Sequence, residues 1–231
     1  TSRLGKKIIE ITHVSKSFGE RCVVKDFSHV LLRDARIGII GRNGCGKSTL
    51  IKMIAGVLPP DSGSIARGAT VKIGYLSQML DTPPDEMRVI DYIKEEAGEI
   101  ATDEGVISAA RMLERFLFPS SVQWTQVRKL SGGEKRRLFL LRILMGAPNV
   151  LLLDEPTNDL DTDTLTVLEE YLESFAGAVV TISHDRYFLD KVVNTIFEFR
   201  EGGEIRQYTG GYTDYLEKRE PEAEESDAAP A

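Results

Sequence analysis

Short apolar runs and helical spacings alternate along the chain. Ile8–Val14 and Cys22–Leu32 are rich in β-forming residues around a turn at Phe18–Glu20, which predicts an antiparallel layer. Val150–Leu153 and Ala178–Ile182 are instead continuous apolar runs, which are typical of parallel strands covered on both faces. The sequence therefore predicts two kinds of β-structure.

The segment between the two continuous runs has helical spacing. Its apolar residues follow two capping candidates, Asp161 and Thr162, and they are Leu165, Leu168, Leu172 and Phe175. Strand, helix and strand in this order predict an α/β fold. Thr195–Phe199 and Ile205–Tyr208, joined through Glu201–Gly203, predict a closing hairpin.

Residues 81–129 lack strand signals. Their apolar residues have helical spacing, as at Val89, Ile90, Ile93, Met112, Leu113, Phe116 and Leu117. We therefore expect a helical lobe of residues 81–130, inserted into a sheet domain formed by residues 8–80 and 131–216.

Composition is that of an ordinary globular chain, with 231 residues and 42% hydrophobic content. More than half of the formal charge of −7 lies in Glu217–Ala231, which has no apolar face. This acidic tail is predicted to be disordered, with a functional acidic arm as the alternative. The chain begins at Thr1 without Met, so residues 1–7 are interpreted as the remnant of a linker in a longer protein.

Targeting and membrane signals are missing from the sequence. There is no run of about 18 apolar residues and no signal segment, so we expect a cytoplasmic protein without membrane insertion. Cys22 and Cys45 lie in a strand candidate and in a glycine-rich loop, which favours a reducing compartment over a disulfide framework.

The glycine-rich loop fits the phosphate-binding P-loop pattern at every required position. Its glycines allow main-chain N–H groups to turn towards an anion, and the following helix directs its positive end at the same place. Lys47 is predicted to reach the β- and γ-phosphates, and Ser48 to bind Mg2+. The predicted nucleotide-binding residues here are Gly41, Arg42, Asn43, Gly44, Cys45, Gly46, Lys47, Ser48 and Thr49.

Two acids end the Val150–Leu153 strand. Asp154 is predicted to hold Mg2+ through its coordinated water, and Glu155 to orient or deprotonate the water that attacks the γ-phosphorus. A helix cap is the alternative for either acid. Given the P-loop, we favour catalysis.

Two further polar residues end strand candidates. His184 follows the Ala178–Ile182 strand, where an imidazole can hydrogen-bond the γ-phosphate. Gln78 follows the Val71–Ser77 strand candidate and would contact Mg2+ or the attacking water. His13 and His29 have no such context and are interpreted as structural.

A second glycine-containing segment precedes a helix with Leu138, Leu141 and Leu144. It comprises Leu130, Ser131, Gly132, Gly133 and Glu134. This is either a second phosphate-binding helix start, serving a nucleotide held by another subunit, or an ordinary serine cap.

Together these segments follow the order and spacing of an ABC-type ATPase cassette, which the chain resembles over Ile8–Leu216. The resemblance implies an α/β fold with a P-loop NTPase (RecA-like) core, a mainly parallel sheet, an antiparallel layer and an inserted helical subdomain. It also implies ATP and Mg2+ as ligands. Two cassettes would stack head to tail, so that Ser131, Gly132 and Gly133 act on the partner's ATP. Phe18 matches the position that stacks on adenine, with a buried core role as the alternative, and Asp161 matches the segment that crosses the dimer seam.

Finer features resemble the ABC-F group, whose members carry two cassettes and generally act on ribosomes. Glu134 stands where transport cassettes usually have Gln, and Asp159 is nearer the Uup-like pattern. The resemblance implies a second cassette, in the same parent chain or as a homodimer, and a ribosome or structured RNA as partner. Lys129, Lys135, Arg136 and Arg137 would either contact phosphates or be solvated helix charges.

The favoured hypothesis is an ATPase used as a timer, in which ATP closes the sandwich and hydrolysis releases the target. The alternative is the ATP-binding subunit of a membrane transporter. An isolated P-loop phosphotransferase leaves residues 130–134 unexplained.

Overall fold

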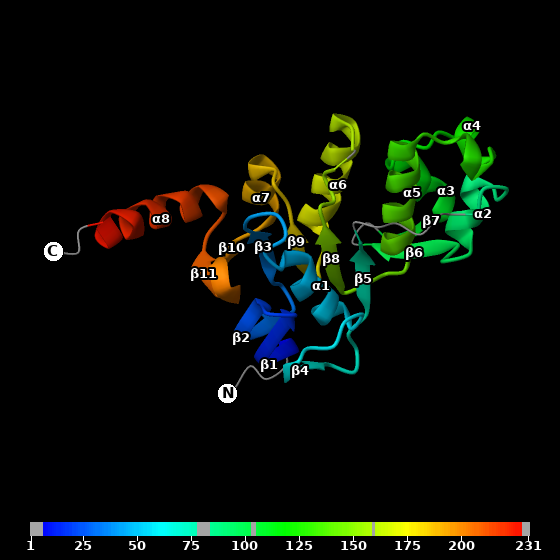
Figure 1. Ribbon diagram of the computed structural model, residues 1–231. Helices are drawn as coiled ribbons and strands as arrows, with labels where there is room; N and C mark the ends of the chain where they lie inside the picture. Colours follow the sequence, from blue (N-terminus) through cyan, green and yellow to red (C-terminus); the bar gives the residue numbers. More distant parts are fainter. Residues whose placement is uncertain (1–6, 78–83, 103–104, 159, 228–231) are drawn as a thin grey trace. The chain divides into compact units, whose positions relative to one another are not determined.

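The computed structural model describes residues 7–77, 84–102, 105–158 and 160–227. The chain divides into two compact units (Figure 1). Unit 1 comprises Thr1–Val71 and Ala178–Ala231, and unit 2 comprises Lys72–Gly177. The predicted helical lobe, residues 81–130, has other limits than unit 2, and these limits stay a prediction.

Unit 1 contains the predicted antiparallel layer. β1 (Lys7–Phe18) lies between β2 (Arg21–Leu32) and β4 (Ser62–Arg67) and pairs antiparallel with both. Ile9 and Ile11 of β1 are buried whereas Glu10 and Thr12 are exposed, as expected for a strand with one covered face.

The other strands of unit 1 are mainly parallel. β3 (Arg36–Ile40) pairs in parallel with β9 (Ala178–Ile182) and with β10 (Thr195–Phe199), and β10 forms an antiparallel hairpin with β11 (Ile205–Thr209). All of β9 is buried. Because β3 and β9 are parallel neighbours, the segments that follow them leave the sheet at the same edge.

Helices complete unit 1. α1 (Lys47–Ala55) follows β3 and ends at Gly56, whose φ of 82° allows the left-handed cap. α7 follows β9, η2 connects β10 with β11, and α8 follows β11; their bounds are α7 Arg186–Val192, η2 Glu201–Gly203 and α8 Tyr212–Asp227.

α8 includes part of the predicted disordered tail, which begins at residue 217. Its start is held by Asp190, whose carboxylate accepts hydrogen bonds from the Thr213 N–H at 2.8 Å and the Thr213 hydroxyl at 2.6 Å. Tyr215 is buried, and its hydroxyl donates to Glu198 at 2.6 Å. These contacts fix the first turns of α8.

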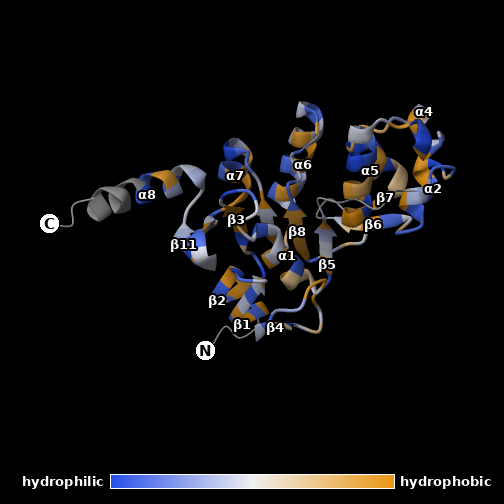
Figure 2. Cartoon of the chain, in the orientation of Figure 1, coloured by the Kyte–Doolittle hydropathy of each residue, from blue (hydrophilic) through white to orange (hydrophobic). Residues whose placement is uncertain are grey.

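Unit 2 contains a pair of parallel strands, β5 (Ile73–Leu76) and β8 (Val150–Asp154). All of β8 is buried, and Figure 2 shows its apolar character. The helices of this unit are α2 Val89–Lys94, α3 Ala109–Arg115, α4 Ser120–Gln123, η1 Val127–Lys129, α5 Gly132–Met145 and α6 Thr162–Ser174.

The segment predicted as a helical lobe also contains a pair of strands, for which the sequence showed no signal. β6 (Glu99–Thr102) and β7 (Gly105–Ser108) form an antiparallel hairpin. Ile100 and Ile107 lie opposite each other and are both buried, whereas Val106 is exposed. Strands this short contain too few alternating positions for a pattern search to detect.

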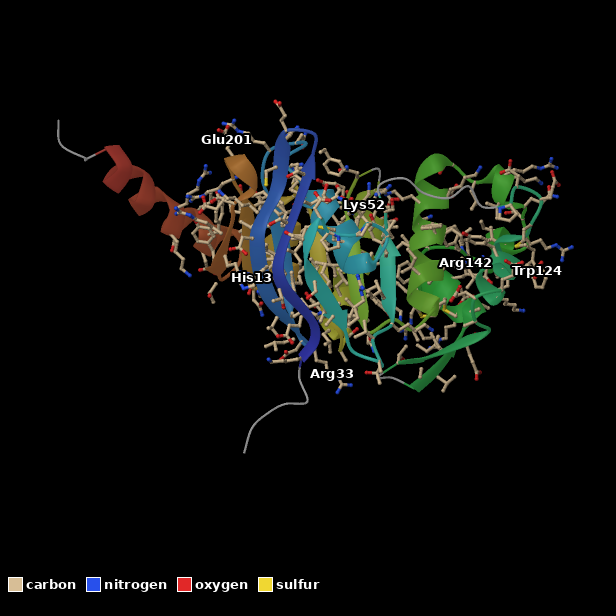
Figure 3. All side chains as sticks on the ribbon, turned by 60° about the horizontal axis from the view of Figure 1, so that its bottom comes forward. His13, Arg33, Lys52, Trp124, Arg142 and Glu201 are labelled. Carbon is tan, nitrogen blue, oxygen red and sulfur yellow. The ribbon has the colours of Figure 1, made fainter. Side chains whose placement is uncertain are left out.

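Arg142 near the end of α5 contacts α2 (Figure 3). Its guanidinium donates to the Tyr92 carbonyl at 2.9 Å and lies 4.3 Å from the centre of the Tyr92 ring. This contact stabilises the packing of the two helices. Among the described residues, no helix has the length and apolarity that crossing a membrane requires.

Candidate functional site

The P-loop lies between β3 and α1 in unit 1. Gly44 and Gly46 have φ values of 77° and 119°, in the region that favours glycine. A Cβ on Gly46 would also lie 2.6 Å from the Val23 carbonyl oxygen. The motif's glycines are therefore required both by the turn and by the approach of β2.

Lys47 is the first residue of α1 and is only 7% exposed. Its ammonium donates to the carbonyls of Gly41 at 2.7 Å and Arg42 at 2.9 Å. The Lys47 ammonium thus bonds to the main chain of the P-loop itself. Ser48 and Thr49 are half-buried in the first turn of the same helix, where a hydroxyl and N–H groups are available to an anion and its metal.

Arg21 also supports the loop, although no sequence pattern indicated this. Its guanidinium donates to the Gly44 carbonyl at 2.7 Å. Arg42 is paired with Glu201 at 3.0 Å on the surface. A long-range contact from a side chain to the main chain leaves no periodic signal, so sequence alone does not reveal it.

His184 follows β9 and reaches the P-loop. Its Nε2 forms a hydrogen bond with Asn43 Oδ1 at 3.2 Å. Both residues line a cavity of about 1060 Å3, together with Gly41 and Cys45. The structure therefore brings His184 to the P-loop, as the parallel arrangement of β3 and β9 requires.

Phe18, at the end of β1, is 53% exposed. The Lys16 ammonium lies 5.7 Å from the centre of its ring. This exposure excludes the buried core role and leaves a ring face available for stacking on a flat ligand. His13, in contrast, is bonded to Asp26 at 2.6 Å on the surface, consistent with a structural role.

Asp154 and Glu155 lie in unit 2, where β8 ends. Both are buried, with 2% and 7% exposure. Burial, together with the Asp154 carboxylate, raises the pKa of the neighbouring Tyr75 hydroxyl. Hydroxyl and carboxylate oxygens of the kind that Ser48 and Asp154 provide are the donors that Mg2+ prefers, so these residue types fit that ion.

Glu155 has a φ of 52°, which is unusual for a residue with a side chain. Such a conformation costs about 1–3 kcal/mol and persists only where neighbours enforce it. Arg136 of α5 provides one such contact, because its Nη2 donates to the Glu155 carbonyl at 2.8 Å. The N–H of Asn158 approaches the same carbonyl at 3.3 Å.

Arg136 and Arg137 are buried, with 7% and 8% exposure. This burial excludes the role of solvated helix charges, and both guanidinium groups bond to other segments of unit 2. Helical spacing could have predicted this burial. Arg136 and Arg137 precede Leu140 and Leu141 by four residues, so all four lie on the buried face of α5. Lys135 is paired with Asp85 at 3.5 Å.

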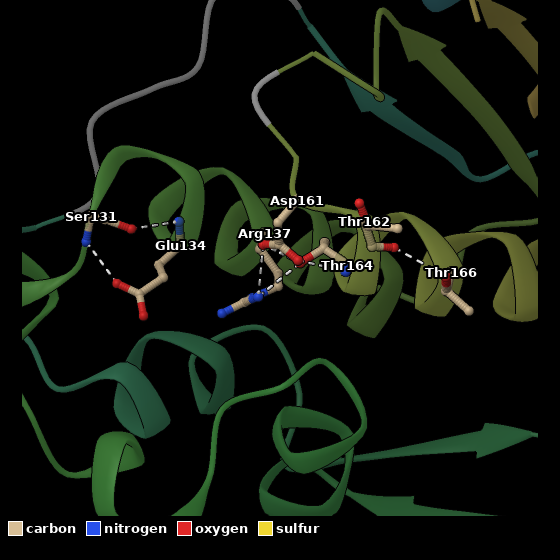
Figure 4. Close-up of polar contacts among 7 residues, drawn as sticks. All are labelled: Ser131, Glu134, Arg137, Asp161, Thr162, Thr164 and Thr166. Carbon is tan, nitrogen blue, oxygen red and sulfur yellow. Dashed lines mark hydrogen bonds and ion pairs between the residues drawn. The ribbon is translucent and has the colours of Figure 1, made fainter.

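The start of α5 is a capping box (Figure 4). The Ser131 hydroxyl accepts from the Glu134 N–H at 3.2 Å, and the Glu134 carboxylate accepts from the Ser131 N–H at 2.8 Å. Ser131 is thus a helix cap, which was one of the two interpretations of this segment. A Cβ added at Gly132 would have no atom within 4 Å, so this first turn is accessible to a ligand.

Asp161 caps α6 in the same unit. Its carboxylate accepts from the Thr164 N–H and hydroxyl, both at 2.9 Å. Arg137 donates to the Thr164 hydroxyl at 2.7 Å and lies 3.4 Å from Asp161 (Figure 4). The hydrogen bonds from Thr164, with a smaller contribution from Arg137, lower the pKa of Asp161.

We expect Asp161→Ala to lower the free energy of unfolding by about 1 kcal/mol at pH 7, because α6 loses its cap. The pKa of Asp161 is lower in the folded chain, so its stabilisation is present above the pKa of the unfolded state, about 3.9. It is lost as the pH falls through the folded value. Urea unfolding at pH 7 and at pH values below 4 measures both effects.

Asp161→Asn is the matched control for this cap. Asparagine caps helices about as well as aspartate, so this variant should keep most of the stability at pH 7 and lose only the pH dependence. An Asp161→Ala variant as stable as the wild type at pH 7 would contradict the prediction.

The site residues fall into two groups. The P-loop and His184 lie together in unit 1, whereas Asp154, Glu155, the Ser131–Glu134 segment and Asp161 lie in unit 2. Gln78 lies outside the described residues, as does Asp159. That both groups serve one reaction is part of the proposal below.

Comparison with known proteins identifies the family. A sequence model of the family described as "ABC transporter" matches residues 24–158. The chain belongs to this family. The matched range includes the P-loop, the Ser131–Glu134 signature segment and the Asp154–Glu155 pair, and ABC cassettes are in general ATP-binding ATPases.

Similar proteins include members of the ABC-F group. The chain is 54% identical to an uncharacterized ABC transporter ATP-binding protein, YfmR, of Bacillus subtilis, over 94% of this chain and 34% of YfmR. It is 40% identical to the energy-dependent translational throttle protein EttA of Escherichia coli, over 93% of this chain and 39% of EttA. It is 39% identical to the ATP-binding protein Uup of E. coli, over 100% of this chain and 37% of Uup.

Solved structures share the fold. An ATP-binding subunit of an ABC transporter matches with a TM-score of 0.76 and 19% identity, over 93% of each chain. The dimeric cassette MJ0796, bound to ADP and Pi, matches with a TM-score of 0.69 and 21% identity, over 87% of this chain and 98% of that one. The predicted P-loop α/β class is confirmed. The cassette spans only 34–39% of the length of the curated relatives named above.

Proposed function

We propose that this cassette binds and hydrolyses ATP, and that its nucleotide state acts as a timer on ribosomes or structured RNA. The conformation of the P-loop carries the nucleotide part of the proposal. Its glycines adopt positive φ values, and the buried Lys47 ammonium already lies against the loop carbonyls. A triphosphate entering this loop would find main-chain N–H groups and one cation directed at it.

Catalytic roles then follow from the chemistry of the residues. Ser48 and Asp154 would hold Mg2+, with Gln78 as a further ligand, and the ion would neutralise charge on the phosphates. Glu155 would orient the attacking water and accept its proton. His184 would donate a hydrogen bond to the γ-phosphate, and Phe18 would stack on adenine.

A head-to-tail sandwich would complete each active site. Gly132 and Gly133 begin α5 beside an accessible surface, so Ser131–Glu134 would contact the nucleotide held by a second cassette, with Asp161 at the seam. The second cassette would come from the same parent chain or from another copy. The dimeric state of the ADP-bound cassette MJ0796 supports this arrangement.

The role in translation is supported by similarity to EttA, which is described as an energy-dependent translational throttle protein. In this proposal the chain is the second cassette of a cytoplasmic ABC-F protein of the Uup-like branch. The competing proposal is the ATP-binding subunit of a membrane transporter. The description of the family and of YfmR favours that alternative.

Sedimentation distinguishes the two proposals. The intact parent protein carrying Glu155→Gln is mixed with ATP, Mg2+ and either ribosomes or membranes. Pelleting with ribosomes only when ATP is present is the expected result. A variant that also carries Lys47→Ala is the control, because its weakened ATP binding should shift ribosome pelleting to higher ATP concentrations. Recovery with membranes instead would overturn the translation role.

A further inference from the structure

Two consecutive arginines join α5 to the two functional segments that follow it in unit 2. Arg136 donates to the main chain of Glu155, and Arg137 donates to Thr164 beside the Asp161 cap. The Arg137 guanidinium also lies 4.7 Å from the centre of the Phe118 ring, which supports its buried position. α5 is therefore attached to the turn that contains Glu155. It is also attached to the start of α6, as Figure 4 shows for Arg137.

The contact made by Arg136 is suited to control the conformation of Glu155. It is a hydrogen bond of 2.8 Å from a charged donor to a carbonyl, and both residues are buried. Glu155 adopts a φ of 52°, which requires support from its neighbours. Without this donor, the peptide of Glu155 is expected to relax towards ordinary backbone angles, and its carboxylate would move.

The other end of the connection is the accessible start of α5. Arg136 follows Gly132 by four residues, which is about 6 Å along the helix axis. The Ser131–Glu134 capping box keeps this first turn helical. A ligand that shifts or tightens this turn would therefore move Arg136 together with the rest of the helix.

We infer that Arg136 is a positioning residue that holds Glu155 in its catalytic conformation and couples it to the nucleotide contacted by the signature segment. In the proposed sandwich, that nucleotide belongs to the opposite site. Each cassette would thus adjust its own catalytic glutamate to the occupancy of the other site. This inference rests on the proposed function.

The test compares Arg136→Met and Arg136→Lys with a matched control, Arg142→Met. Arg142 lies on the same helix, near its other end. It also donates to a main-chain carbonyl, that of the buried Tyr92. Both methionine substitutions remove one charge and one contact with the main chain. A purely structural role would therefore affect both variants alike.

Hydrogen exchange of the chain without ATP measures the positioning directly. Arg136→Met should speed the exchange of the Asn158 amide, which faces the Glu155 carbonyl, by tenfold or more. Arg142→Met should leave that amide unchanged. Arg136→Lys keeps a donor and should fall between the wild type and Arg136→Met. Unchanged exchange in both Arg136 variants would overturn the inference.

Steady-state hydrolysis measures the coupling. Arg136→Met should lower kcat at least tenfold while KM and the Kd for ATP stay within twofold, and its Hill coefficient for ATP should fall to 1. Arg142→Met should keep the wild-type kcat. A wild-type Hill coefficient of 1 would overturn the coupling. A wild type that neither binds nor hydrolyses ATP would instead overturn the proposed function, while hydrogen exchange would still decide the role of Arg136.

Discussion

Glu155→Gln is expected to keep ATP binding intact and to lower the rate of hydrolysis by about a hundredfold or more. The amide retains the size of the carboxylate but cannot accept a proton from water, and removing a general base typically costs on the order of 10²–10⁴ in rate. Phosphate release under saturating ATP measures the rate, and calorimetry measures binding. Because ATP would remain in place, the sandwich should also persist longer.

Glu173→Gln is the matched control, since Glu173 is exposed on α6 and lies outside the proposed site. It should hydrolyse ATP at the wild-type rate. If Glu155→Gln turned over ATP as fast as the wild type, Glu155 would not be the residue that activates water. If it lost ATP binding as well, its main contribution would be structural.

Lys47→Ala is expected to weaken ATP binding by about ten- to a hundredfold. A hydrogen bond to a charged group contributes about 1.5–3 kcal/mol, and each 1.4 kcal/mol corresponds to tenfold in Kd. The ammonium is already buried against the Gly41 and Arg42 carbonyls, so ATP would only redirect its bonds. Calorimetric titration with Mg-ATP measures the change.

Lys52→Ala tests whether the loss of ATP affinity is specific to Lys47. Lys52 is on the same helix, α1, but its side chain is exposed near the helix end (Figure 3). This variant should bind ATP like the wild type. Equal affinity of Lys47→Ala and wild type would exclude Lys47 from phosphate binding and would contradict the assignment of the P-loop.

The residues of the candidate site could be predicted from sequence because phosphate-binding loops use contiguous residues. A glycine at position 46 is required by local backbone angles, and Lys47 and Ser48 follow it directly on the helix. The same holds for the Ser131–Glu134 capping box and for Asp161, whose partners are three residues away. Buried runs such as those of β8 and β9 likewise predicted strands whose ends carry polar residues.

Other features depend on segments that are distant in sequence. Charge composition suggested a disordered tail from residue 217, whereas contacts with Asp190 and Glu198 hold the first turns of α8. The β6–β7 hairpin forms from strands too short to show alternation. In both cases tertiary contacts outweighed the local signal.

By itself, the sequence determined the P-loop α/β class, the place of the glycine-rich loop before α1 and the acids that end β8, because short-range geometry and burial periodicity specify them. Only the tertiary structure decided that Arg136 holds the Glu155 carbonyl and that Arg137 holds the start of α6. Those partners lie 19 and 27 residues away. Which distant acceptor a buried guanidinium finds is fixed by packing, and packing leaves no repeating pattern in the chain.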